Sequence, residues 1–231
     1  YGYNNVSITF LYNNNRILDK IEMNEGDYSG TLDIFYHNNK VTSLRYFGYN
    51  EEGDYEGNYP ISYSGNTMYI PTDEDETEED GLTFYYDNYG KINKVSWGEK
   101  LEIGDYEYGE DLLDWSDNNV VTLTNNSEYR FSGDTYSQTN NTTFQYDGKK
   151  NPYSLLETEI QAILIWLDVQ EDWYHPYLAD YFSKSNVVKE IGNNESSLEK
   201  KYTYNSDGYL ESIEVPASDW YPDVTISFEY K

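Results

Sequence analysis

The chain has no cysteine, two histidines and few basic residues. Its 231 residues hold 15 Lys and Arg against 43 Asp and Glu, a net charge of −28. Without cysteine, disulfides and thiolate metal sites are excluded, and two isolated histidines do not predict a zinc site. The missing basic residues argue against binding to nucleic acid or to an anionic membrane surface. No apolar run is long enough for a membrane-spanning helix, so we expect a protein that does not cross the membrane.

Catalytic signatures are missing as well. The sequence has no Gly-x-Ser-x-Gly nucleophile elbow and no phosphate-binding loop. His37 falls in an expected turn and should be exposed, and His175 precedes Pro176 at an expected helix start. Pairs of carboxylates could serve glycoside hydrolysis, but 43 acidic residues offer too many pairs for any of them to be informative. We therefore expect no cofactor and no catalytic residue.

Tyrosine is the abundant residue. The chain has 28 tyrosines, although the nine hydrophobic residue types make up only 37% of it. A tyrosine ring can be buried while its hydroxyl group stays hydrated or hydrogen-bonded. A tyrosine-rich sheet can therefore fold around few aliphatic residues, and disordered chains of high charge are poor in aromatics. We expect a folded protein.

A two-stranded unit recurs along the chain. Each copy has an apolar and aromatic strand ending in Tyr, a turn of Asn, Asp or Gly, and a second apolar strand. A repeated hairpin predicts an antiparallel meander, and these turn residues tolerate positive φ. We therefore expect an all-β fold, a curved or closed barrel sheet, in one domain over 1–231. The clearest copies span 82–97 and 202–215, looser copies span 8–23 and 32–46, and further ones lie at 61–70 and 113–123.

Two details refine the hairpins. Ile92 and Val95 are three residues apart, which predicts a bulge just after the turn.

In a meander, the linkers between hairpins gather at one end of the sheet. Acidic residues concentrate in those linkers, at 25–27, 51–56, 73–80 and 102–111, so we expect one strongly negative rim.

One segment breaks the β pattern. Ser154 and Glu157 have the spacing of a capping box, and apolar residues follow at helical intervals from Leu156. A helix with apolar residues on two faces should be buried. We expect a helical insertion over 152–185, in which Ile163 and Trp166 are inaccessible.

The turns carry a resemblance. The sequences Tyr-Asp-Asn-Tyr-Gly-Lys-Ile-Asn-Lys-Val and Tyr-Asn-Ser-Asp-Gly-Tyr-Leu-Glu-Ser-Ile resemble the tyrosine–aspartate hairpin repeats of large bacterial surface and toxin-shell proteins. Most of the chain is similar to a family of secreted or lipid-anchored Bacteroidetes domains of unknown function with a porin-like β-barrel fold. The resemblance rests on 146–153, which leads into the helix, and on 182–189, which leads out of it.

The resemblance implies an exported protein that is tethered by a lipidated cysteine upstream of Tyr1. Its location would be the outer membrane, the periplasm or the cell surface. It brings no catalytic residues with it. Charged residues such as Asp19, Lys20 and Glu22 lie across the middle of an expected strand, so a soluble barrel or open sheet fits better than a membrane-spanning barrel.

Two kinds of binding residue can be named. The acidic run 73–80, with Asp73, Asp75 and Asp80, offers oxygen ligands for Ca²⁺, but it lacks the spaced pattern and glycine of a dedicated site. A solvated loop that binds Ca²⁺ weakly at most is the favoured interpretation. Exposed aromatic rings can stack on sugars, although packing across strands is the commoner role. The aromatic candidates are Trp97, Trp115, Trp173 and Trp220.

Three functions stay open. The favoured one is a non-catalytic exported or cell-surface domain that binds a glycan or a protein partner. The alternatives are a carboxylate-dependent glycoside hydrolase and a Ca²⁺-dependent binding module. A deep pocket with two facing acids would favour the hydrolase, and an aromatic strip on a filled sheet would favour the binding domain.

Overall fold

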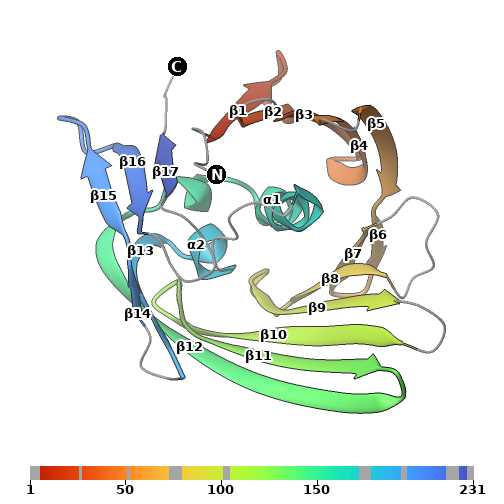
Figure 1. The fold of residues 1–231 in the computed structure, drawn as a ribbon. Coiled ribbons are helices and arrows are strands. Elements are labelled where there is room, and N and C mark those ends of the chain that lie inside the picture. The colour runs from red at the N-terminus through yellow and green to blue at the C-terminus, as the bar shows by residue number, and fades with distance from the viewer. Residues whose placement is uncertain are drawn as a thin grey trace. The chain divides into compact units, whose positions relative to one another are not determined.

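The protein is all-β with a short helical insertion between two of its strands (Figure 1). The computed structural model describes residues 6–25, 28–50, 53–72, 80–100, 105–171, 178–193, 197–216 and 224–227. They form two open sheets, and within these residues neither sheet closes on itself. The repeat predicted either a curved sheet or a closed barrel, and the described residues show no closed barrel.

The first sheet has eight strands in the order β15-β16-β17-β1-β2-β3-β4-β5. Its neighbours are antiparallel except β1 and β17, which pair in parallel through Val6 and Ile226. N-terminal and C-terminal strands of the chain therefore belong to the same sheet. The strands are β1 (Val6–Tyr12), β2 (Leu18–Glu25), β3 (Tyr28–His37), β4 (Lys40–Asn50), β5 (Gly53–Pro60), β15 (Lys201–Tyr204), β16 (Leu210–Val215) and β17 (Val224–Ser227).

The second sheet has nine strands in the order β14-β13-β12-β11-β10-β9-β8-β7-β6. Each strand lies beside its neighbour in sequence, so this sheet is the meander that the repeat predicts. The strands are β6 (Ser62–Ser64), β7 (Thr67–Pro71), β8 (Gly81–Tyr86), β9 (Ile92–Lys100), β10 (Tyr106–Ser116), β11 (Asn119–Phe131), β12 (Asp134–Lys150), β13 (Ser185–Gly192) and β14 (Ser197–Glu199).

Five hairpins share one irregularity. The aromatic residue before the turn pairs with a buried apolar residue after it, and the next residue has no partner across the ladder. In β8–β9 that extra residue is Asn93, so Ile92 and Val95 both reach the core. The predicted bulge is confirmed. The aromatic and apolar pairs are Tyr12 with Leu18, Tyr36 with Val41, Tyr86 with Ile92, Trp115 with Val120, and Tyr204 with Leu210.

Two turn types close these hairpins. In the five-residue type, an Asx side chain accepts hydrogen bonds from two backbone N–H groups, as Asp87 does from Tyr89 (2.7 Å) and Lys91 (2.9 Å). Its fourth residue has positive φ, which Gly90 provides at 79°. In the two-residue type, both residues have positive φ, as at Asn38 and Asn39. The predicted Asn, Asp and Gly chemistry therefore closes most hairpins.

The helical segment differs in detail from the prediction. A 3₁₀ helix, η1 (Pro152–Leu155), comes first and is capped by the Asn151 side chain. Ser154 lies inside η1 and does not cap the α-helix, because Glu157 supplies the carbonyl that the first helical N–H groups bond. The predicted capping box is therefore wrong, and the α-helices are α1 (Thr158–Glu171) and α2 (Leu178–Phe182).

Helix α1 is buried on every side. All nine residues from Ile160 to Asp168 are buried, and Ile163 and Trp166 have no exposed surface. The indole N–H of Trp166 donates to the Pro71 carbonyl at 2.7 Å, which attaches the helix to β7. The prediction that Ile163 and Trp166 are inaccessible is confirmed. Among the described residues, no helix has the length and apolarity needed to cross a membrane.

The chain forms two compact units. Unit 1 comprises residues 1–62 and 200–231 and contains the eight-stranded sheet. Unit 2 comprises residues 63–199 and contains the helices and nearly all of the nine-stranded sheet. The single domain over 1–231 stays a prediction.

Candidate functional site

The described tryptophan candidates both make contacts inside unit 2. Trp97 of β9 lies opposite Gly109 of β10, and a Cβ atom on that glycine would come within 2.2 Å of the Trp97 ring. The indole N–H of Trp115 donates to the Ile92 carbonyl at 3.0 Å, and the Lys91 ammonium lies 4.8 Å from its ring centre. Both residues are half-buried. These contacts give each ring a packing role, and a binding role stays a prediction.

Several other candidates fall outside the described residues. Asp80 is described: it is 3% exposed, and its carbonyl accepts hydrogen bonds from the Tyr69 hydroxyl (2.8 Å) and the Thr72 N–H. His37 ends β3 and is exposed, as predicted. Within the described ranges no three His, Cys, Asp or Glu residues gather where they could hold a metal ion. The candidates outside those ranges are Trp173, Trp220, Asp73, Asp75 and His175.

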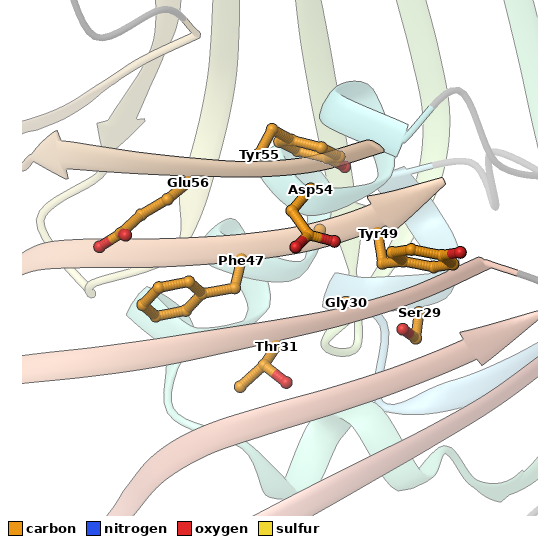
Figure 2. Close-up of a pocket in the computed structure, with 9 residues that line it drawn as sticks. Ser29, Gly30, Thr31, Phe47, Tyr49, Asp54, Tyr55 and Glu56 are labelled. Atoms are coloured by element: carbon orange, nitrogen blue, oxygen red, sulfur yellow. The ribbon is translucent and has the colours of Figure 1, made fainter. Parts of the chain in front are cut away.

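A hollow of about 460 Å³ lies on the β3–β5 part of unit 1 (Figure 2). Strand alternation puts six of its side chains on one face of the sheet, which we call the outer face. Two glycines without side chains, Gly30 and Gly48, pair directly and form its floor. The outer-face side chains are Ser29, Thr31, Phe47, Tyr49, Asp54 and Glu56.

Tyrosines fill the opposite side of the glycine floor. A Cβ atom on Gly48 would lie 2.0 Å from the Tyr55 ring, and one on Gly30 would lie 2.3 Å from the Tyr46 hydroxyl. The two rings lie 5.5 Å apart, and the Tyr55 hydroxyl donates to that of Tyr46 at 3.3 Å. Gly30 and Gly48 therefore let two rings lie against the backbone on the inner face. The hollow lies on the other face of the same backbone.

Charged neighbours fix the aromatic wall of the hollow. The Arg45 guanidinium lies 4.9 Å from the centre of the Phe47 ring and donates to Asp33 at 2.7 Å. Lys20 also contacts Asp33, at 3.3 Å. Burial alone would raise the pKa of Asp33, but the Arg45 and Lys20 contacts outweigh it and lower that pKa. Asp33 thus stays ionised and holds Arg45 against Phe47.

The opposite wall is acidic. Asp54 and Glu56 alternate along β5 and are exposed, and the rings of Phe47 and Tyr49 lie across from them on β4 (Figure 2). Tyr49 is 54% exposed. The prediction that 51–56 is a linker is wrong for these two residues, because β5 begins at Gly53. The site therefore offers two rings for stacking beside hydrogen-bond acceptors and the hydroxyl groups of Ser29 and Thr31.

Among the described carboxyl groups, the one with the largest pKa shift belongs to unit 2 and is buried. Asp168 of α1 accepts a hydrogen bond from the Tyr181 hydroxyl of α2. Burial raises the pKa of Asp168 to about 8, against the lowering effect of that hydrogen bond, and the nearby Asp180 adds to the increase. Asp168 and Tyr181 are 8% and 4% exposed. This pair joins two helices.

Sequence reasoning missed the hollow for a physical reason. Its aromatic residues, Phe47 and Tyr49, belong to a strand whose pattern also serves packing, so nothing marks them as exposed. The tyrosines on the inner face, not the hollow, explain the glycine pair, since interior-strand glycines such as Gly30 and Gly48 indicate a close approach of other groups to the backbone. Their pairing follows only from the register.

Comparisons with known proteins give distant matches. No protein-family model matches the chain, and no curated protein matches it. A solved structure of a porin-like protein from Bacteroides vulgatus is similar with a TM-score of 0.39 and 10% identity, over 100% of this chain and 99% of that one. A porin-like protein from Bacteroides uniformis gives a TM-score of 0.35 and 11% identity, over 96% and 94%. Similarities this distant carry no information about function.

Proposed function

We propose that the protein is a non-catalytic exported domain that binds a carbohydrate in the β3–β5 hollow. The observation that carries this proposal is the pairing of Phe47 and Tyr49 with Asp54 and Glu56 around a glycine floor. A sugar ring presents apolar C–H groups on its faces and hydroxyl groups around its edge. Aromatic rings complement the faces, and carboxylates accept hydrogen bonds from the hydroxyl groups.

The support for this chemistry is geometric. Arg45 restrains Phe47 on one side, so less side-chain freedom is lost when a ligand stacks on that ring. Four polar side chains lie beside two rings in the hollow, which suits a ligand that has both hydroxyl groups and apolar faces. The volume of the hollow, about 460 Å³, lies in the usual range for small-molecule sites.

A binding role fits better than hydrolysis. Glycoside hydrolysis needs a carboxyl group that stays protonated at neutral pH, which requires a desolvated setting. Asp54 and Glu56 are both exposed on an open sheet face. The enclosed carboxyl group of Asp168 is hydrogen-bonded to Tyr181 between two helices. Display at the cell surface, by a lipid anchor upstream of Tyr1, is the location that we propose for this binding role.

A glycan array tests the proposal. The purified chain should bind one class of neutral glycan, and Tyr49→Ala should reduce its affinity at least about tenfold because it removes the most exposed ring. Asp54→Asn, which keeps the shape but weakens the acceptor, should have a smaller effect. Binding should persist in high salt, because stacking and hydrogen bonds to a neutral sugar are not screened.

Two controls make the test specific. Tyr209→Ala removes a tyrosine of equal exposure, 55%, from another part of unit 1 and should leave binding unchanged. The reducing-end content of bound glycans should not rise with time. No binding to any glycan class, or turnover that Asp54→Asn abolishes, would sink the proposal.

A further inference from the structure

Strand β12 leaves half of one edge without a partner strand. It is 17 residues long and pairs along most of its length with β11, which lies beside it in Figure 1. On its other side, the ladder with β13 begins only at Thr142. Within the described residues, no strand pairs with the outer edge from Asp134 to Asn141.

The ladder shows which backbone groups face outward there. The two-residue turn between β11 and β12 makes Phe131 and Asp134 a hydrogen-bonded pair, and every second pair along an antiparallel ladder has the same pattern. The N–H and C=O groups of Thr135, Ser137 and Thr139 therefore point away from β11.

The Asn193 side chain supports this assignment. It donates to the Thr139 carbonyl at 3.3 Å and accepts from the Asn141 N–H at 3.1 Å, as a neighbouring strand would. Asn193 therefore caps the inner end of the edge. The outward groups of Thr135 and Ser137 have no such cap among the described residues.

This edge lacks the usual protections. Exposed edges are normally blunted by Lys, Pro, a bulge or a short strand. The register of β12 with β11 is regular from Asp134 to Thr143, and the segment has neither Lys nor Pro. All residues from 131 to 140 are exposed, so this ribbon has no core beneath it. The edge is open to an incoming strand.

The edge carries little charge. Residues 135–146 carry no charged side chain, although the chain has 43 acidic residues in 231. Two copies with a net charge of −28 repel each other over most of their surface. A neutral edge is where two such copies can approach with the least repulsion, which favours a second copy of this chain as the occupant.

We propose that two copies of the chain associate through antiparallel pairing of this β12 edge. A two-fold axis at Tyr136 would pair Thr135 of each copy with Ser137 of the other, forming four backbone hydrogen bonds. Tyr136 would then face Tyr136 of the second copy. Each Tyr136 is already stacked on Tyr129, with ring centres 5.2 Å apart, so four rings would form one row.

Sedimentation equilibrium over a range of protein concentrations tests this pairing. The chain should show a monomer–dimer equilibrium that strengthens with added NaCl, because salt screens the repulsion between acidic copies. Ser137→Pro should weaken dimerisation at least about tenfold, since it removes two intermolecular hydrogen bonds per dimer. The same substitution breaks no bond to β11, because the Ser137 N–H faces outward.

Ser137→Ala is the matched control, because it keeps the N–H group and should dimerise like the parent. Circular dichroism and a thermal melt establish that Ser137→Pro is folded. A second readout is amide hydrogen exchange, in which Thr135 and Ser137 should become protected as concentration rises. A parent chain that stays monomeric at every concentration and salt level, or a folded Ser137→Pro that dimerises like the parent, would overturn the proposal.

Discussion

Units 1 and 2 are built from the same hairpin but differ in how they treat their exposed strands. In unit 1, β3–β5 keep one face buried and use the other to display Phe47, Tyr49, Asp54 and Glu56. In unit 2, the far ends of β11 and β12 are exposed on both faces and offer a backbone edge instead. The repeat therefore builds a scaffold, and the candidate functions lie where each unit departs from it.

The cores differ as well. Unit 2 contains α1, of which nine consecutive residues are buried, while the described part of unit 1 consists of strands and turns alone. Unit 1 instead places Tyr46 and Tyr55 against glycine backbone. Unit 2 thus adds a buried helix to its core, and unit 1 packs tyrosine rings against glycine backbone. Both arrangements bury surface in a protein with few aliphatic residues.

The largest effect should come from the helix of unit 2. Leu164 is 2% exposed, so Leu164→Asp buries an unpaired charge and should lower the free energy of unfolding by about 4 kcal/mol or more. Val169→Asp, at a 45% exposed position of the same helix, is the matched control and should cost little. Chemical denaturation measures both. Equal midpoints for Leu164→Asp and the parent would show that α1 is dispensable.

The tyrosine–glycine contacts of unit 1 should give a graded response. Gly30→Ala drives a Cβ atom against Tyr46, which is 1% exposed and has no room to move, so it should cost about 2–3 kcal/mol. Gly48→Ala meets Tyr55, which is 40% exposed and can swing outward, so it should cost about 1 kcal/mol. Denaturant melts that rank the two variants in the opposite order would contradict this packing account.

The Asp168–Tyr181 pair should make unit 2 sensitive to pH. The pKa of Asp168 is raised from 3.8 to about 8, so the folded state binds more protons than the unfolded state between these values. Its contribution to stability is complete below pH 4 and is lost as pH rises toward 8, with a slope of up to about 1.4 kcal/mol per pH unit.

Asp168→Asn removes that titration while its side-chain oxygen can still accept from Tyr181. The variant should therefore show a shallower fall in stability between pH 4 and 8 than the parent, measured by denaturant melts at several pH values. Titrations elsewhere in this acidic chain affect both proteins alike, so the difference between the two curves isolates Asp168. Parallel curves would mean that Asp168 is ionised in the folded protein.

The sequence was most informative where local chemistry decides the structure. The turns at Asp87 and Asn38 and the bulge at Asn93 follow from residues within a few positions of each other. The burial of Trp166 follows from helical spacing. The predicted helix start is wrong because Asn151, which precedes Pro152, caps the first turn in place of Ser154, and that turn is the 3₁₀ helix η1.

The rest depends on register, which a single sequence does not specify. The β3–β5 hollow needs Gly30 opposite Gly48 and Phe47 opposite Glu56, and these pairs come from three different strands. Asp54 and Glu56 looked like linker residues because Asp, Glu and Gly are poor strand formers. The first half of β12 was missed because its Thr, Ser and Asn residues show no apolar alternation.

Amide chemical-shift mapping with the strongest glycan from the array tests the central claim most directly. If the carbohydrate binds unit 1 as proposed, the largest shifts will fall on Gly30, Gly48 and Tyr49 and their neighbours on β3–β5, and Tyr49→Ala will abolish them. The amides around Trp97 and Trp115 in unit 2 will stay unchanged. Shifts centred on those two tryptophans, or no shifts at saturating glycan, would contradict the account.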